Sequence, residues 1–123
     1  MIKLGGFILA AQLEHSCSRR NTACGTSMYM APEVYDGNTC LKSDIWSLGI
    51  SIIEMAENKN PFAEGTPIQV MKEMCFNKPP SLTSSSWSSD LRDFITRCLQ
   101  KDVDERASVD DLLKARITSR SNE

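Results

Sequence analysis

Residues 43–56 read SDIWSLGISIIEMA, and this stretch decides the fold. Apolar side chains recur nearly all the way round a helical wheel, which is typical of a central helix that other elements must cover. Ser43 is predicted to cap the start of this helix, and Asp44 places negative charge at its positive end. The polar run NKNP at residues 58–61 is predicted to end it.

Three further helices are predicted downstream of this segment. Each begins with a residue whose side chain can accept a hydrogen bond from the first turn. The second of the three presents a single apolar stripe at helical spacing, formed by Leu91, Phe94, Ile95, Cys98 and Leu99. The starts are Thr66, with Pro67 at the first helical position and Gln69 completing a capping box, about Ser89, and Ser108, which pairs with Asp111.

The chain upstream of the central helix is poor in regular pattern. Ile2–Leu4 is a short apolar stretch that is predicted to be a strand, stopped by the two glycines that follow it. Residues 12–34 are polar and rich in helix breakers, and a loop of that length is usually functional or disordered. We therefore expect a mainly α fold behind one long N-terminal loop.

The composition is that of one ordinary globular domain. The chain has 123 residues, 41% of them hydrophobic and 24% charged, with a formal net charge of -2. Nucleic acids and anionic membranes bind clustered Lys and Arg, so this balance argues against both as the main partner. No apolar run approaches the length of a membrane span, and no secretory signal is recognisable at the N-terminus.

The five cysteines are odd in number, widely spaced and without a CxxC pair. A zinc site needs ligands that are closely paired in sequence or otherwise brought together. A secreted disulfide framework usually has an even number of cysteines. We expect reduced thiols and a cytoplasmic protein. The cysteines are Cys17, Cys24, Cys40, Cys75 and Cys98, and the single histidine is His15.

Three ordered motifs carry the functional information. Residues 25–33 read GTSMYMAPE, residues 42–49 read KSDIWSLG, and residues 97–108 contain RCLQKD followed by ERAS. Together they resemble the end of a protein kinase activation segment, the central helix of the large lobe and the stretch that closes the domain. The sequence around residues 20–22 and 60–62 is most similar to that of the sterile-20-like serine/threonine kinases. The activation-segment motif closes with Ala31, Pro32 and Glu33.

The resemblance implies a partial kinase domain over residues 1–117. Residues 1–34 would be the activation-segment region, residues 35–117 the helical large lobe, and residues 118–123 a disordered tail. This is a mainly α, kinase-like large-lobe fragment without the small lobe or the catalytic loop. The activity of the family is ATP-dependent phosphorylation of protein serine and threonine, with ATP and Mg²⁺ as cofactors.

One departure from the family pattern bears on catalysis. Lys3-Leu4-Gly5-Gly6-Phe7-Ile8 aligns with the family's Asp-Phe-Gly segment and places Gly6 where the magnesium-binding Asp belongs. Glycine offers no carboxylate oxygen to the metal. Within these 123 residues nothing matches the Gly-rich loop, the strand lysine or the catalytic loop. We therefore expect no catalytic, cofactor-binding or metal-binding residues, and a pseudokinase-like chain that is inactive by itself.

The resemblance also assigns roles in the activation segment. Thr22 matches the threonine that the family phosphorylates, and a phosphate there would pair with Arg19 and Arg20, although an exposed loop threonine is an equal alternative. Gly25 and Thr26 match the loop that receives the substrate. Because the family partner of Thr26 is the catalytic Asp, a purely local hydrogen bond is the favoured account of Thr26 here.

Four further residues match structural positions of the family. Glu33 and Arg106 match an ion pair that ties the activation segment to the closing helices. Asp44 matches the anchor of the catalytic loop, but a helix-start acid is the safer account. Trp46, in the same motif as Gly49, is expected to fill core space.

Three accounts of the chain follow from these observations: a piece of a serine/threonine kinase, a kinase-derived docking or scaffold module, or a decayed sequence that makes little stable protein. Met71 and Met74 lie in a segment that resembles a partner-docking kinase helix, although ordinary packing is favoured. Protein partners are expected. Apolar surface left uncovered on the central helix predicts marginal stability or self-association.

Overall fold

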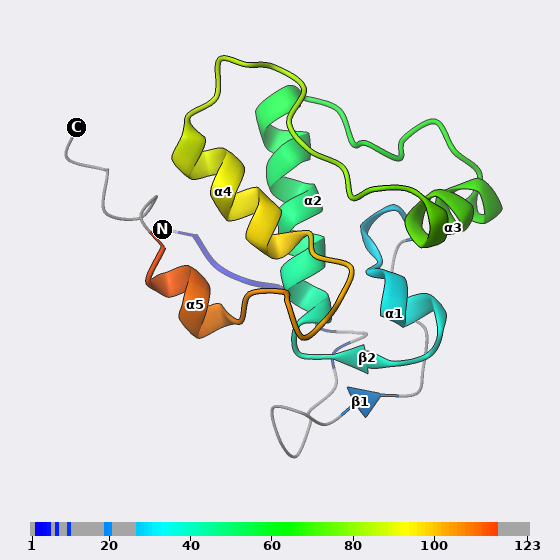
Figure 1. Cartoon of the computed structure of the whole chain (residues 1–123). Helices are drawn as coiled ribbons and strands as arrows, with labels where there is room; N and C mark the ends of the chain where they lie inside the picture. The colour runs from blue at the N-terminus through cyan, green and yellow to red at the C-terminus, as the bar shows by residue number, and fades with distance from the viewer. Residues whose placement is uncertain (1, 6, 8–9, 11–18, 21–26, 116–123) are drawn as a thin grey trace.

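The computed structural model describes residues 2–5, 7, 10, 19–20 and 27–115, and this part of the chain is mainly helical (Figure 1). The predicted mainly α class is therefore confirmed. The elements in chain order are β1 (Arg19–Arg20), η2 (Ser27–Tyr29), α1 (Pro32–Tyr35), β2 (Thr39–Cys40), α2 (Ser43–Glu57), α3 (Pro67–Phe76), α4 (Ser89–Cys98) and α5 (Val109–Leu113), where η2 is a 3-10 helix.

Helix α2 runs through the middle of the molecule, with α4 packed along it (Figure 1). Its buried side chains face α4 and the segment that contains η2 and α1. This single core explains why the central segment is so apolar. The α2 side chains in it are Ile45, Trp46, Ile50 and Ile53, each no more than 5% exposed.

Gly49 is the point of closest approach between α2 and α4. A Cβ atom placed on Gly49 would lie 2.8 Å from the Cβ of Cys98 and 2.8 Å from a methyl carbon of Leu99. Both neighbours are fully buried, so neither has free space to move into. The glycine therefore sets the distance between the two helices.

The predicted caps of α3 and α5 are confirmed. Thr66 Oγ1 accepts a hydrogen bond from Gln69 N at 3.3 Å, and the Gln69 side chain accepts one from Thr66 N at 2.9 Å. Ser108 and Asp111 make the same reciprocal pair at the start of α5. Helix α4 begins at Ser89 as expected, with the preceding serine as its cap.

The expected cap of α2 is wrong. Ser43 is the first residue inside the helix rather than its N-cap, which is Lys42. The Ser43 hydroxyl instead donates to Glu33 Oε2 at 2.6 Å and accepts from Cys40 N at 3.0 Å. A buried carboxylate from another element outcompetes the local backbone for this hydroxyl.

The N-terminal expectations were only partly met. Ile2–Leu4 was predicted to be a strand, but these residues lie in no strand, and Ile2 and Leu4 are 95% and 87% exposed. A short apolar run does not form a strand without a neighbouring strand to pair with. The predicted long loop contains β1, which pairs antiparallel with β2 so that Arg19 faces Cys40. The predicted disordered tail at residues 118–123 lies outside the described residues.

Helix α2 keeps one uncovered apolar edge. Leu48 is 40% exposed and Met55 is 75% exposed, on a helix that the sequence predicts to be wrapped on all sides. The covering is therefore incomplete among the described residues. Within them, no helix combines the length and the apolar character that crossing a bilayer requires.

Replacing Gly49 by alanine is expected to lower the free energy of unfolding by about 1–3 kcal/mol, because the added methyl group overpacks the α2–α4 contact. Urea unfolding followed by circular dichroism measures this. Gly5→Ala is the matched control, because a Cβ at Gly5 meets nothing within 4 Å. Alanine is the better helix former, so an unchanged or increased stability for Gly49→Ala would show that the helices are not in tight contact.

Candidate functional site

The candidate site is the segment formed by η2 and α1, residues 27–35, where it lies against α2 and α3 (Figure 1). Two groups of polar side chains attach this segment to the helices. One surrounds Glu33 in α1 and the other surrounds Tyr29 at the end of η2. Both reach α2, but at opposite ends of the segment.

Glu33 and Arg106 form a buried two-point ion pair. Arg106 Nη1 donates to Glu33 Oε2 at 2.8 Å, and Arg106 Nη2 donates to Glu33 Oε1 at 2.9 Å. Their side chains are 8% and 0% exposed, respectively. The matched geometry of guanidinium and carboxylate makes such pairs strong and directional. The resemblance to protein kinases predicted that these two residues pair, and the structure places them together.

Two further donors of Arg106 bind main-chain carbonyls. Its Nε donates to the carbonyl of Gln100 at 2.8 Å, and Nη1 donates to the carbonyl of Lys42 at 2.9 Å. The guanidinium carbon lies 5.3 Å from the centre of the Trp46 ring, within the range of a cation–π contact. Arg106 thereby joins the residues before α5 to the start of α2.

Glu33 stays ionised in this setting. Burial disfavours the charged carboxylate, but the hydrogen bonds from Arg106 and Ser43 outweigh it, so the pKa of Glu33 lies below its ordinary value of 4.5. A neutral Glu33 would leave the Arg106 charge buried without a counter-charge. The position of α1 therefore depends on this charge.

Tyr29 is held by a second polar group. Its hydroxyl donates to Glu54 Oε2 in α2, and its carbonyl accepts from Ser47 Oγ at 2.8 Å. Asn60 Nδ2 also donates to Glu54 Oε2, at 3.3 Å. The hydrogen bond to Glu54, together with burial, raises the pKa of Tyr29 above its ordinary value. The phenol is therefore held in its protonated, donating form.

These residues were missed by the sequence analysis, although a signal for them was present. Four of the polar residues of α2 recur at i, i+4, i+8 and i+11, which places them near one side of the helix. A polar stripe on a central helix indicates buried hydrogen-bond partners. The stripe consists of Ser43, Ser47, Ser51 and Glu54.

The other predicted site residues divide into described and undescribed ones. Ala31 is fully buried in extended backbone, and Pro32 follows it at the first position of α1. Asp44 is exposed in the first turn of α2. Trp46 is fully buried in the core, as expected, and its Nε1 has no hydrogen-bond partner among the described residues. The residues that lie outside the described part of the chain are Gly6, Thr22, Gly25 and Thr26.

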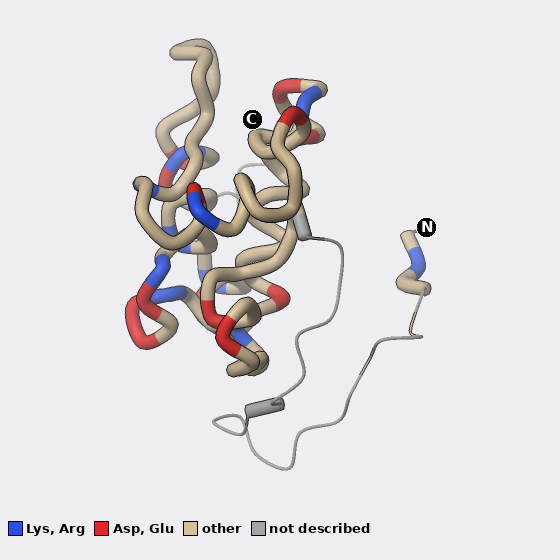
Figure 2. Tube along the Cα trace, turned by 90° about the vertical axis from the view of Figure 1, so that its right-hand side faces the viewer, with Lys and Arg blue, Asp and Glu red and all other residues tan. Residues whose placement is uncertain are grey.

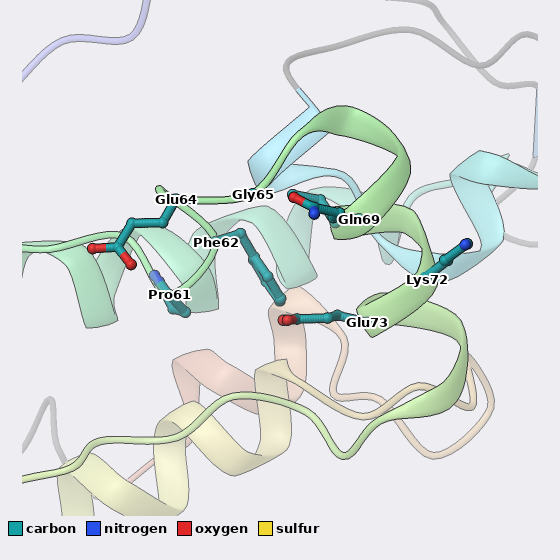
Figure 3. A pocket seen from close by; sticks show the side chains of 8 residues that line it. Pro61, Phe62, Glu64, Gly65, Gln69, Lys72 and Glu73 are labelled. Carbon is teal, nitrogen blue, oxygen red and sulfur yellow. The ribbon is translucent and has the colours of Figure 1, made fainter.

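A hollow of about 460 Å³ lies between the loop at residues 61–65 and α3 (Figure 3). Figure 3 shows the Phe62 side chain pointing from the loop toward α3. Glu64, Lys72 and Glu73 also line the hollow, so charges of both signs surround an apolar floor. In the described part of the chain, no group of His, Cys, Asp or Glu side chains is arranged to hold a metal ion.

Comparison with known proteins places these features in one family. The family described as "Protein kinase domain" matches residues 1–117. The chain is 42% identical over 115 residues to "Serine/threonine-protein kinase hippo" of Drosophila melanogaster, which covers 91% of this chain. It is 41% identical to "Serine/threonine-protein kinase KIC1" of Saccharomyces cerevisiae and 44% identical to "Serine/threonine-protein kinase dst1" of Dictyostelium discoideum, over 94% and 91% of this chain. The chain spans 17%, 11% and 16% of the length of these three proteins.

A double-mutant cycle is expected to show strong coupling between Glu33 and Arg106. Arg106→Ala should lower the free energy of unfolding by about 3–5 kcal/mol, because it leaves a buried carboxylate unpaired. Glu33→Ala should lower the free energy of unfolding much less in the Arg106→Ala variant than in the parent chain. The difference between these two effects is the coupling energy, and it should exceed about 1 kcal/mol. Denaturant unfolding of the four proteins measures this.

The exposed pair Asp93–Arg97 is the control for this cycle. Its two atoms lie 2.9 Å apart, but the side chains are 60% and 51% exposed. A coupling of only about 0.3–0.5 kcal/mol is expected there. If the buried pair couples no more strongly than the exposed one, Glu33 and Arg106 do not hold α1 in place.

Proposed function

Because this chain belongs to the serine/threonine protein kinase domain family, we propose that it is the part of a kinase domain that anchors the end of the activation segment on the large-lobe helices. The observation that carries this proposal is the Glu33–Arg106 pair, which fixes α1 to the residues before α5. In a kinase the activation segment presents the substrate to the catalytic groups. A fixed end of that segment supports substrate positioning.

We propose that these residues do not transfer phosphate by themselves. In the family, a carboxylate at the position of Gly6 holds Mg²⁺. The side chain of glycine is a hydrogen atom, which cannot bind a metal ion. The 123 residues contain no match to the strand lysine or to the catalytic-loop base. The residues present therefore do not fit Mg²⁺-ATP, and no catalytic step is assigned to them.

The activation-segment roles remain proposals that rest on the family resemblance. Thr22 is the proposed phosphorylation site, with Arg19 and Arg20 as the nearby cations in sequence. Gly25 and Thr26 are the proposed substrate-facing residues. In sequence, these residues precede the anchored segment at residues 27–35.

Proteins are the proposed partners of this chain, and nucleic acids and membranes are not. Figure 2 shows Lys and Arg interspersed with Asp and Glu along the described trace, rather than gathered by sign. Binding to a phosphate backbone needs a concentrated basic surface. The cytoplasm is the proposed compartment, because the odd number and wide spacing of the five cysteines favour reduced thiols.

A docking or scaffold role is the second candidate, and exposed apolar side chains support it. On α3, Ile68 is 63% exposed and Phe76 is 84% exposed. On α2, Leu48 and Met55 leave an apolar edge uncovered. Exposed apolar groups gathered on helix faces are typical of surfaces that bind another protein. Self-association through the α2 edge is the specific form that we propose.

The purified chain is expected to incorporate no phosphate into casein from radiolabelled Mg²⁺-ATP, above a blank without protein. The physical reason is the missing metal ligand, lysine and base. Gly6→Asp should behave in the same way, because it supplies one ligand and neither of the other groups. An active serine/threonine kinase in parallel tubes controls for the assay. Incorporation that follows the chain through successive purification steps would refute the proposed inactivity.

Self-association is expected to weaken when Met55 is replaced by glutamate, because a charge at the centre of an apolar contact must be desolvated. Sedimentation velocity over a concentration series measures the change. Val109→Glu, at a side chain in α5 that is 59% exposed, is the control and should leave association unaltered. A chain that is monomeric at all concentrations, with or without either substitution, would rule out the α2 edge as an interface.

A further inference from the structure

Asn60 is a buried polar residue that stands apart from the Glu33–Arg106 group. It follows α2 and directly precedes Pro61 and Phe62, which line the hollow shown in Figure 3, and only 3% of the residue is exposed. Buried amides are costly unless their hydrogen bonds are satisfied. Its hydrogen-bond partners therefore indicate what Asn60 does.

Asn60 uses both ends of its amide. Its Oδ1 accepts from Phe62 N at 2.8 Å, and its main-chain carbonyl accepts from Ala63 N at 3.1 Å. This is the local turn that Asn commonly forms with the backbone two residues ahead. The amide Nδ2 remains available, and it donates to Glu54 Oε2 at 3.3 Å.

The oxygen that receives Asn60 is the same oxygen that receives the Tyr29 hydroxyl. A glutamate side chain has three rotatable bonds, and two donors on one oxygen restrict them. Tyr29 is also held through its carbonyl by Ser47, one turn from the start of α2. A continuous set of hydrogen bonds thus joins the loop that lines the hollow to η2.

We propose that Asn60 is a positioning residue that orients the Glu54 carboxylate and, through it, fixes Tyr29 and the end of η2. This rests on the proposed function, in which residues 27–35 support the substrate. Phe62 links the same turn to the hollow, because its backbone N–H bonds Asn60 and its side chain lines the cavity.

Aspartate at this position separates the two roles of Asn60. An aspartate still accepts a hydrogen bond from Phe62 N, so the turn is kept. It cannot donate to Glu54, and it places a second negative charge beside that carboxylate. Glu54→Gln combined with Asn60→Asp restores the pairing with reversed polarity, because the glutamine amide can donate to the aspartate.

The test uses the whole chain labelled with ¹³C at the tyrosine Cζ, and follows the pKa of Tyr29 by NMR. The chain has two tyrosines, and Tyr35→Phe leaves the signal of Tyr29 alone. Asn60→Asp should raise the pKa of Tyr29 by about 1 unit, because the added carboxylate disfavours the phenolate. Glu54→Gln should lower it, and the double variant should return it toward the parent value.

Two outcomes would overturn the positioning role. If Asn60→Asp folds and leaves the pKa of Tyr29 unchanged, Asn60 only forms the turn and the proposal fails. If Asn60→Asp does not fold, the double variant should regain the parent circular dichroism spectrum, and its failure to do so also overturns the proposal. No phosphate transfer is measured, so a negative result here leaves the proposed kinase role untouched.

Discussion

The buried pair of Glu33 and Arg106 is the constraint on which the rest of the structure depends. Two charges removed from water are stable only when each is fully paired, and here the carboxylate has Arg106 and Ser43 as donors. The arginine in turn holds two main-chain carbonyls and lies over Trp46. These contacts come from parts of the chain that are distant in sequence, so they can all be satisfied only in one arrangement.

The central helix links this pair to the candidate site. Ser43 and Ser47, one turn apart on α2, bind Glu33 and the carbonyl of Tyr29, and Glu54 two turns further on binds the Tyr29 hydroxyl. The segment from η2 to α1 is therefore attached to α2 at both of its ends. On the opposite side, Gly49 lets α4 approach closely and completes the core. One helix thus provides the packing of the domain and the anchor of the site.

Anchoring and the proposed inactivity of this kinase-family chain depend on different residues. Glu33, Arg106 and Trp46 fix the position of α1 on the helical core. The proposed inactivity rests on Gly6, at a position where the family carries a magnesium-binding carboxylate. Asn60 belongs to the anchoring residues, because it donates to the same Glu54 oxygen that accepts from the Tyr29 hydroxyl.

The sequence by itself determined the helical class and the starts of α3, α4 and α5, and its resemblance to protein kinases implied that Glu33 pairs with Arg106. Capping boxes and apolar periodicity involve residues three or four positions apart, so they can be recognised from the sequence without knowledge of the tertiary structure. The tertiary structure alone decided the role of Ser43. Its hydroxyl does not cap α2 but binds the carboxylate of Glu33, ten residues earlier in the chain. It also decided that Ile2–Leu4 pairs with no strand among the described residues, and that Tyr29, Glu54 and Asn60 meet. Those outcomes depend on which distant groups compete for one hydrogen bond, and spacing along the chain does not encode that competition.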